Sequence, residues 1–296
     1  MDLGNHLGTS KIYILKLIKG LGIRMEPFIR EAKPEDKPFI EEIARLTWEG
    51  EDYLARVFDS WVKDGNFYVL ELEGKVVGTA KLTILPDKVG WLEGLRVHPN
   101  YQKRGFGRVL HNFMLHKGKE LAEKGVINAL EFSTYFLNKE SIAMAKKEGF
   151  KVVKRYYIVG KPVKDVRPSK PSDSTINSLE ELEYMKYIPV GWKLIHRVPE
   201  ALEWLRKKAI VKECNETKFM IPKDSESAFV PFHLSKEYVS KILPCMVHEA
   251  LSENQKYIET MVPEERKEVV ESLRELGFEI WDNCKEPNVL VFRKEF

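Results

Sequence analysis

The chain has 296 residues, of which 43% are hydrophobic and 31% are charged. This composition excludes a wholly disordered chain, and the length exceeds the commonest domain size of about 100–150 residues, so we expect two domains. The formal net charge of +3 is too small to indicate nucleic-acid binding. No apolar run reaches the roughly 18 residues of a membrane-spanning helix, which excludes a membrane span.

Charge is divided unevenly along the chain. Residues 1–164 carry 28 Lys/Arg and 21 Asp/Glu, a net charge of +7, whereas residues 165–296 carry 20 and 24, a net charge of −4. The first half therefore favours a phosphate-bearing ligand. Lys and Glu are abundant and only two glutamines occur, a bias typical of thermophile proteins.

The three cysteines, Cys214, Cys245 and Cys284, are widely spaced and form no CxxC pair. We therefore expect buried thiols in a reducing cytoplasm, without a disulfide framework and without a zinc or other metal site.

Residues 1–24 form an N-terminal extension, interpreted as a short packing helix or as a segment upstream of a start at Met25. Hydrophobic periodicity and turn residues then predict the elements of a first domain, residues 25–162. In chain order these are strand Phe28–Glu31, helix Pro34–Trp48, helix Glu51–Lys63, strands Phe67–Leu72, Val76–Leu85 and Trp91–Val97, a helix ending at Glu123, strand Ile127–Ser133, helix Lys139–Glu148 and strand Val152–Val159. This order predicts a mixed α/β fold (α+β), with a mainly antiparallel sheet flanked by helices.

One segment has the features of an anion-binding loop. Residues 92–107 read LEGLRVHPNYQKRGFG, a strand that runs into a Q-x-x-G-x-G loop where a helix begins. Two glycines let the backbone approach a ligand, and N–H groups at a helix start favour negative charge. The segment is not a Walker loop, because Arg108 follows Gly107, and it lacks the third glycine of a dinucleotide fingerprint, because Leu110 stands there.

On these residues the sequence resembles the GCN5-related N-acetyltransferase (GNAT) family over about Phe28–Lys161. The match comprises Glu93, Leu95, Val97, Pro99, Gln102, Gly105 and Gly107, followed by Asn138 and the pair Gly149-Phe150. The resemblance implies an acyl-CoA N-acyltransferase fold that binds acetyl-CoA between the strands Trp91–Val97 and Ile127–Ser133. The residues implied to contact the cofactor are Leu95, Arg96, Val97, Gln102, Lys103, Arg104, Gly105, Phe106, Gly107, Arg108 and Asn138.

Catalysis requires a base that deprotonates the acceptor amine. Strand alternation places Trp91, Glu93, Leu95 and Val97 on one face, so we expect Glu93 to be this base; a structural or substrate-orienting carboxylate is the alternative. The family usually has a tyrosine four residues before the Gly-Phe pair that protonates the departing thiolate, but Ala145 stands there. Tyr135 is the expected substitute, with lining of the acceptor site, simple packing or proton donation by water as alternatives.

A narrower resemblance, carried by residues 51–65 (EDYLARVFDSWVKDG) and 92–97 (LEGLRV), is to the histidine N-acetyltransferase subgroup. It implies a small amine acceptor, such as a free amino acid. Trp48, Glu49 and Tyr53, together with Glu51 and Asp52, are then candidates to hold a cationic amine, and ordinary packing and helix-start charge are the alternative.

The second half repeats the order of the first. Gly149-Phe150 recurs as Gly277-Phe278, within strand Tyr257–Val262, helix Pro263–Leu276 and strand Val289–Arg293, and helix Lys236–Leu251 precedes them. The segment before that helix lacks glycine and clustered basic residues. We therefore expect residues 163–178 to be a linker and residues 179–296 a degenerate GNAT-like domain, which completes the acceptor pocket, positions strands or forms a homodimer.

The whole pattern predicts a cytoplasmic acetyl-CoA-dependent N-acetyltransferase that acts on a small amine, such as an amino acid or polyamine, by direct transfer in a ternary complex. Two alternatives stay open: a non-catalytic acetyl-CoA-binding sensor or interaction protein, and a protein N-terminal or lysine acetyltransferase.

Overall fold

The computed structural model describes residues 27–296 except residues 51, 184–185 and 224–227. The N-terminal extension predicted for residues 1–24 lies outside the described residues. The described chain separates into two compact units, and the chain passes from one to the other four times. The first unit holds residues up to 84, 88–130 and 295–296, and the second holds 85–87 and 131–294.

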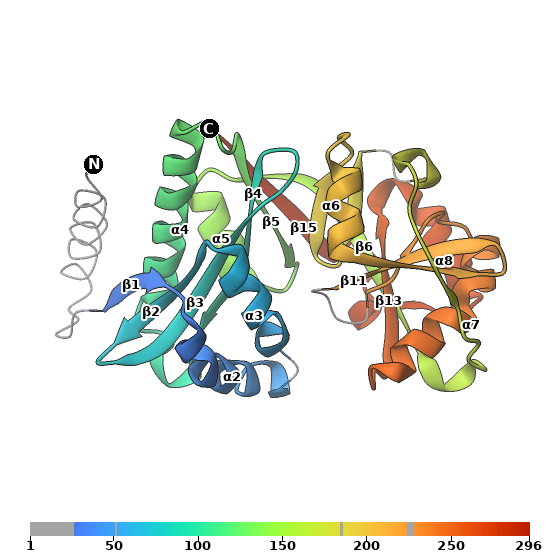
Figure 1. Cartoon of the computed structure of the whole chain (residues 1–296), viewed down its shortest axis with the longest axis horizontal. Helices are drawn as coiled ribbons and strands as arrows, with labels where there is room; N and C mark the ends of the chain where they lie inside the picture. The colour runs from blue at the N-terminus through green and yellow to red at the C-terminus, as the bar shows by residue number, and fades with distance from the viewer. Residues whose placement is uncertain (1–26, 51, 184–185, 224–227) are drawn as a thin grey trace. The chain divides into compact units, whose positions relative to one another are not determined.

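The first unit is an antiparallel sheet with helices on both faces (Figure 1). Its strands follow the order β1-β2-β3-β4. The elements are β1 Phe28–Glu31, η1 Pro34–Asp36, α2 Lys37–Arg45, η2 Trp48–Gly50, α3 Leu54–Asp64, β2 Phe67–Leu72, β3 Lys75–Ile84, β4 Val89–Val97, η3 Pro99–Tyr101 and α4 Phe106–Glu123. The predicted strands agree within two residues, whereas the helix predicted for Pro34–Trp48 is divided into η1 and α2 and ends at Arg45.

The two faces of this sheet pack against different helices. A Cβ atom added at Gly78 of β3 would lie 2.8 Å from Leu110 of α4, whereas one added at Gly94 of β4 would lie 2.4 Å from Trp61 of α3. The apolar side of α3, which includes Leu54 and Phe58, is fully buried with Ile40 and Ile43 of α2 and with β2. Apolar spacings of three and four residues along α3 explain this burial.

The second unit contains a sheet with the order β5-β15-β6-β13, to which β14 adds a second antiparallel pairing with β6. These elements are β5 Ala129–Tyr135, which starts in the first unit, α5 Lys139–Lys147, β6 Lys151–Pro162, β13 Tyr257–Pro263, β14 Glu279–Ile280 and β15 Val289–Glu295. The last strand of the chain therefore lies between β5 and β6.

A smaller sheet and a hairpin complete the second unit. The smaller sheet has the order β12-β11-β10-β7 and the hairpin pairs β8 with β9. The remaining elements are η4 Val163–Asp165, β7 Ser172–Ser174, η5 Leu179–Glu181, β8 Tyr187–Val190, β9 Lys193–His196, α6 Ala201–Lys208, β10 Ala209–Cys214, β11 Thr217–Pro222, β12 Val230–Pro231, α7 Lys236–Ser252, η6 Glu264–Arg266, α8 Lys267–Arg274 and η7 Trp281–Asn283. The segment interpreted as a linker thus contains a strand, β7, which pairs with β10.

The repeated Gly-Phe pairs end helices in both halves, as predicted. Gly149 and Gly277 follow α5 and α8 with φ values of 82° and 83°, the left-handed conformation that glycine adopts at little cost. The strands of the second copy pair with the first copy, because β13 and β15 both bond to β6. Independent domains at 25–162 and 179–296 remain a prediction, since the compact units divide the chain within β5.

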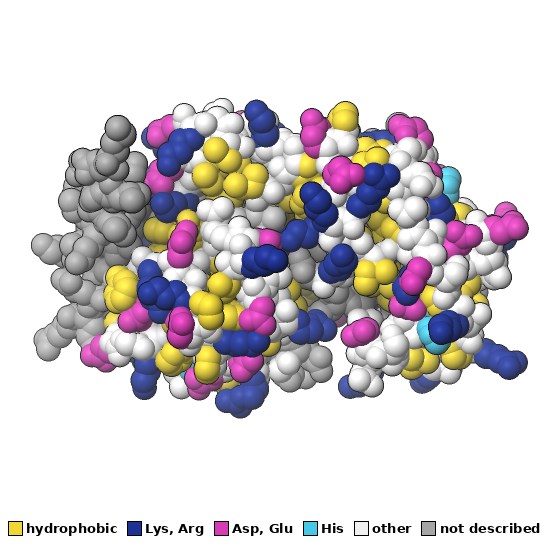
Figure 2. Space-filling view, viewed as in Figure 1, with side chains coloured by type: hydrophobic (Ala, Val, Ile, Leu, Met, Phe, Trp, Pro, Cys, Tyr) yellow, Lys and Arg dark blue, Asp and Glu magenta, His cyan; other side chains and the backbone are white. Residues whose placement is uncertain are grey.

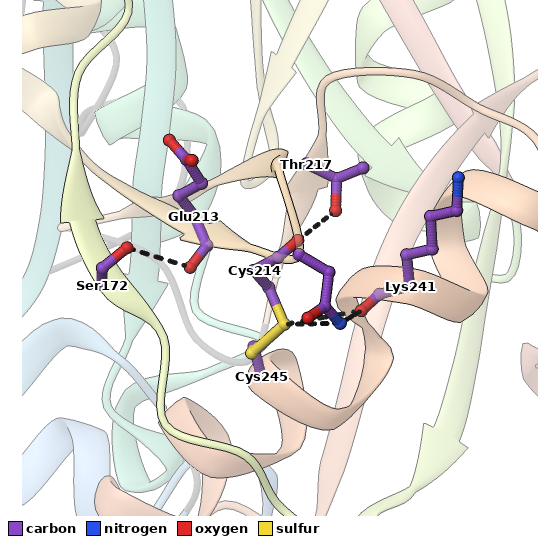
Figure 3. The surroundings of a disulfide bond; sticks show 7 residues. Ser172, Glu213, Cys214, Thr217, Lys241 and Cys245 are labelled. Carbon is purple, nitrogen blue, oxygen red and sulfur yellow. Dashed lines mark hydrogen bonds between the residues drawn. A yellow bond between two sulfur atoms is a disulfide. The ribbon is translucent and has the colours of Figure 1, made fainter.

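The cysteine prediction is wrong for two of the three residues. Cys214, at the end of β10, and Cys245, in α7, form a disulfide with a Cα–Cα distance of 6.2 Å (Figure 3). The two positions are 31 residues apart, so sequence spacing gives no sign that β10 and α7 pack together. Cys284 is a free, partly exposed thiol. The disulfide removes the basis on which a reducing compartment was expected.

Candidate active site

A bulge in β4 determines which side chains meet at the candidate site. Thr79 of β3 pairs with Arg96 and Lys81 pairs with Glu93, so Ala80 alone faces two residues of β4. One of the two, Gly94, has a φ of 63°, and its carbonyl accepts a hydrogen bond of 2.7 Å from the Thr79 hydroxyl. The aromatic ring of Trp61 occupies the space that a Cβ at Gly94 would need. Glycine is therefore required both by conformation and by packing.

The bulge moves Arg96 to the face of Glu93. Side chains alternate between the two faces of the sheet on each side of the bulge. The extra residue reverses the face that each side chain after the bulge would otherwise take. Trp91, Glu93 and Arg96 consequently share the face covered by α2 and α3, whereas Val97 faces α4 beside Gly78. The expectation that Glu93 and Val97 lie on one face is wrong for this reason.

Glu93 is half-buried and hydrogen-bonded. Its Oε1 atom accepts a bond of 2.6 Å from the Thr83 hydroxyl on β3. Its charge also acts on Tyr53, since burial first and then the nearby carboxylates of Glu93 and Asp52 raise the pKa of that phenol well above its usual value. The backbone of Gly94 hydrogen-bonds to the same phenol. Tyr53 is therefore a neutral hydroxyl at ordinary pH and cannot serve as a base.

Arg96 occupies the place predicted for a cationic amine. Its guanidinium carbon lies 4.1 Å from the centre of the Trp48 ring and 5.6 Å from that of Tyr53. Its Nε atom bonds to Asp52 at 2.6 Å, and the Asp52 side chain is fully buried. Glu49 lies in η2, but its side chain, like the whole of Glu51, lies outside the described residues. Trp48 and Tyr53 thus flank a cation that the chain itself supplies.

The predicted anion-binding loop stands at the start of α4. Gly105 precedes the helix with a φ of 84°, and Lys103 also has a positive φ of 60°. The side-chain amide of Gln102 donates a bond of 3.0 Å to the Val97 carbonyl, which ties the loop to the end of β4. This geometry aims the N-terminal N–H groups of an 18-residue helix at one point.

The other loop residues divide into one buried and several exposed side chains. Phe106, the first residue of α4, is buried, whereas Lys103, Arg104 and Arg108 are exposed. The guanidinium of Arg104 lies 5.2 Å from the Tyr101 ring. On the face that Figure 2 presents, basic and acidic side chains are interspersed rather than gathered by sign. Lys103, Arg104 and Arg108 therefore place three exposed basic side chains next to the start of α4.

Asn138 and Tyr135, both in the second unit, have partners of their own. The Asn138 side chain accepts a bond of 3.2 Å from the N–H of Ser141 and so caps α5. The Tyr135 hydroxyl donates a bond of 2.6 Å to Asp282. Burial and this bond raise the pKa of Tyr135 above its usual value, which makes it a weaker proton donor. Ala145 is fully buried in α5.

A buried charged cluster in the second unit was missed by sequence reasoning. Glu131 of β5 has no exposed surface, and its Oε1 atom lies 2.6 Å from Nη1 of Arg293 and 3.2 Å from Nε2 of His196. Asp87 lies 3.5 Å from the same His196 nitrogen. The only sequence signal was Glu131, a single acid within an apolar strand. The other members of the cluster, Asp87, His196 and Arg293, come from three distant segments of the chain. The cluster fastens β9 and β15 to β5.

Within the described ranges, no helix is long and apolar enough to cross a membrane. In the same part of the chain, no group of three or more His, Cys, Asp or Glu side chains is arranged to hold a metal ion.

Comparison with known proteins shows what the first half of the chain resembles. Residues 31–150 match the family model described as acetyltransferase (GNAT) family. Residues 31–150 are therefore similar to GNAT acetyltransferase domains, and the mixed α/β fold, with a mainly antiparallel sheet flanked by helices, matches the GNAT acyl-CoA N-acyltransferase fold. This family uses acetyl-CoA as its co-substrate. None of the curated proteins matches the chain by sequence.

Three solved structures are similar in fold to both halves of the chain. A candidate acetyltransferase from Pyrococcus horikoshii has a TM-score of 0.61 at 16% identity, over 91% of this chain and 89% of its own. A candidate acetyltransferase from Thermoplasma acidophilum has 0.58 at 19%, over 91% and 100%. A GCN5-related N-acetyltransferase from Sphaerobacter thermophilus has 0.58 at 11%, over 91% and 95%.

Proposed function

We propose that the protein transfers an acetyl group from acetyl-CoA to the amine of a small molecule, by direct attack in a ternary complex. One observation carries the proposal: within the first unit, the bulged strand β4 runs directly into a glycine loop at the start of α4. The strand presents a half-buried carboxylate, Glu93, and the loop presents backbone N–H groups and basic side chains. The carboxylate suits an amine, and the loop's N–H groups and basic side chains suit a pyrophosphate.

Glu93 acts as the base. A protonated amine has a pKa of about 10 and cannot attack a thioester, so a carboxylate within reach, directly or through one water, must take its proton. The nitrogen then bonds to the acetyl carbon and the carbon–sulfur bond breaks. Gln102–Arg108 bind the cofactor's phosphates, and Leu95–Val97 pair with its pantetheine arm.

The leaving thiolate requires little assistance. A thiol has a pKa of about 8.5, so its thiolate is a good leaving group near neutral pH. Water supplies the proton, because Ala145 has no acid and the Tyr135 hydroxyl is bonded to Asp282. The bonded Tyr135 also favours the second candidate function, a non-catalytic acetyl-CoA sensor.

Replacing Glu93 tests the base. Glu93→Gln keeps the shape and the bond from Thr83 but removes the negative charge, so kcat should fall by about 10²–10⁴-fold, while the acetyl-CoA Kd measured by calorimetry stays within about twofold. Thr83→Val is the matched control: it removes the donor and retains the carboxylate, and a smaller loss is expected. An unchanged kcat in Glu93→Gln would remove Glu93 as base.

A thiol-release assay distinguishes an acetyltransferase from a non-catalytic acetyl-CoA sensor. A sensor binds acetyl-CoA with the same loop, but no amine accelerates thiol release. Thiol release from acetyl-CoA is therefore measured against amino acids, polyamines and peptides with free N-termini. Acceleration by peptides alone would favour a protein acetyltransferase instead.

A further inference from the structure

His98 lies where β4 leaves the sheet and leads into the predicted anion-binding loop. It directly follows the last residue of β4, and its backbone N–H donates a bond of 2.9 Å to the Val77 carbonyl of β3. The residue is 7% exposed, so its imidazole is buried at the point where the chain turns. The proposed reaction gives this imidazole no step, and its role must therefore come from its contacts.

The imidazole caps the short helix η3. Its Nδ1 atom accepts a bond of 3.2 Å from the backbone N–H of Asn100. The His98 carbonyl accepts a bond of 2.8 Å from the N–H of Tyr101, and the N–H of Gln102 donates one of 3.2 Å to the Pro99 carbonyl. A side-chain acceptor at the start of a helical turn satisfies an N–H group that has no partner within the turn. His98 thereby fixes the backbone that leads from β4 to the loop.

The other ring nitrogen faces a carboxylate. Because Nδ1 is an acceptor, the neutral ring carries its proton on Nε2. The Nε2 atom lies 3.7 Å from Oε1 of Glu42, which belongs to α2. This distance is too long for a hydrogen bond, but the negative charge favours a proton on the nitrogen that faces it. Glu42 therefore keeps Nδ1 available to the N–H of Asn100.

The imidazole also supports an aromatic ring that lies under a cation. The Tyr101 ring meets the His98 ring edge to face, with centroids 5.5 Å apart. On Tyr101 lies the guanidinium of Arg104, with its central carbon 5.2 Å from the ring centroid. Arg104 has no hydrogen bond or ion pair with any residue that the structure describes. Attraction to the ring therefore biases this guanidinium toward one place beside the loop and leaves its N–H groups for a ligand.

We propose that His98 is a positioning residue for the phosphates of acetyl-CoA. It holds the turn before the loop, and through Tyr101 it determines where the guanidinium of Arg104 lies. A phosphate group binds a guanidinium through paired, charge-assisted hydrogen bonds, and a loop that is ordered in advance loses less freedom on binding. The inference rests on the part of the proposed function in which acetyl-CoA binds at residues 102–108, and it applies to an acetyltransferase and to a sensor alike.

The first test separates the two contacts of His98 by substitution, with acetyl-CoA binding to the full chain measured by calorimetry. His98→Phe retains a ring beside Tyr101 but has no acceptor for Asn100, so the Kd should rise at least about fivefold. His98→Asn is the conservative variant, because asparagine is a good capping residue, and its Kd should stay within about threefold of the wild type. An unchanged Kd in His98→Phe would overturn the inference, as would binding by His98→Asn as weak as that by His98→Phe. No binding by the wild type would instead contradict the proposed function.

The second test separates phosphate positioning from a general loss of structure. S-Acetylpantetheine has the thioester and the pantetheine arm but no phosphate. Its Kd, measured by NMR titration, should agree within about twofold between the wild type and His98→Phe, whereas the Kd of acetyl-CoA should differ at least about fivefold. Equal weakening of both ligands would show that His98 only stabilises the fold, and this would overturn the inference.

The third test links Tyr101 to Arg104 and gives an answer even where the His98 variants do not fold. Tyr101→Leu removes the ring and Arg104→Gln removes the cation. The loss of acetyl-CoA affinity caused by Arg104→Gln should be at least about threefold smaller in Tyr101→Leu than in the wild type, because the two side chains act together. Tyr101→Phe retains the ring and is the matched control, with a Kd within about twofold of the wild type. Independent losses that simply multiply would break the link from His98 to Arg104 and overturn the inference.

Discussion

Arg30 binds two carboxylates in the first unit, and one of them makes stability depend on acid. Both terminal nitrogens of Arg30 bond to Asp36 at 2.7 Å, and its Nε bonds to Glu71 at 2.8 Å. Asp36 also accepts the backbone N–H of Lys33 at 2.7 Å. Burial by itself would raise the pKa of Asp36, but the bonds from Arg30 and Lys33 outweigh it and hold the pKa below its usual value.

We predict that Asp36→Asn flattens the acid side of the stability curve. Because the folded-state pKa lies below the unfolded value of about 3.9, the carboxylate stabilises the fold fully above that value. The contribution is lost as the pH falls through the folded-state pKa. Urea unfolding between pH 7 and pH 2 should therefore show a steeper loss in the wild type than in Asp36→Asn, which is less stable at pH 7. Parallel curves would contradict this account.

At the residue scale, sequence reasoning located the strand, loop and helix start of the candidate site but not the contacts among its residues. The motif from Glu93 to Gly107 located the strand, the loop and the helix start correctly, because glycines and apolar periodicity are local signals. The phase of β4 after Gly94 could not be predicted, since a bulge depends on the opposing strand and on Trp61 beneath it. The pairing of Arg96 with Asp52 follows from that phase and was missed for the same reason.

The C-terminal strand β15 joins elements that are far apart in sequence. It lies between β5 and β6, and Phe292 at its bulge is 1% exposed. The Phe292 ring stacks on Phe132 of β5 with centroids 5.2 Å apart, and Phe132 also meets Phe150 edge to face at 5.5 Å. The strand was predicted from its own alternation, but its insertion was not, because a strand's partners are set by the whole chain.

Phe292→Ala should therefore destabilise the second unit strongly. A large buried aromatic residue replaced by alanine costs about 3–5 kcal/mol, through lost burial and the cavity left behind. The matched control is Phe296→Ala, four residues later on a side chain that is 49% exposed, where the expected change is about 0.5 kcal/mol. Equilibrium unfolding in urea gives both values; equal losses would mean that β15 contributes little.

At the scale of the molecule, the two units differ in how they are held together. Hydrophobic packing of α2, α3 and β2 forms the core of the first unit, and this was foreseen from helical periodicity. The second unit additionally has the Cys214–Cys245 bond and the buried Glu131 cluster. Both connect distant segments, so neither leaves a local pattern. Elements were therefore predicted in both halves of the chain but not between residues 179 and 235, where the structure has β8 to β12 and α6.

The disulfide should stabilise the second unit without affecting cofactor binding. It closes a loop of 31 residues, and the loss of unfolded-chain entropy for that length corresponds to about 3–4 kcal/mol. We expect the variant with Cys214→Ser and Cys245→Ser to lose stability of this order in urea, and the reduced wild type to match it. Its acetyl-CoA Kd should stay within about twofold, because residues 102–108 all belong to the first unit. Cys284→Ser, at the free thiol, controls for thiol removal and should unfold like the wild type. A large loss of acetyl-CoA affinity on reduction would show instead that the bond supports the cofactor site.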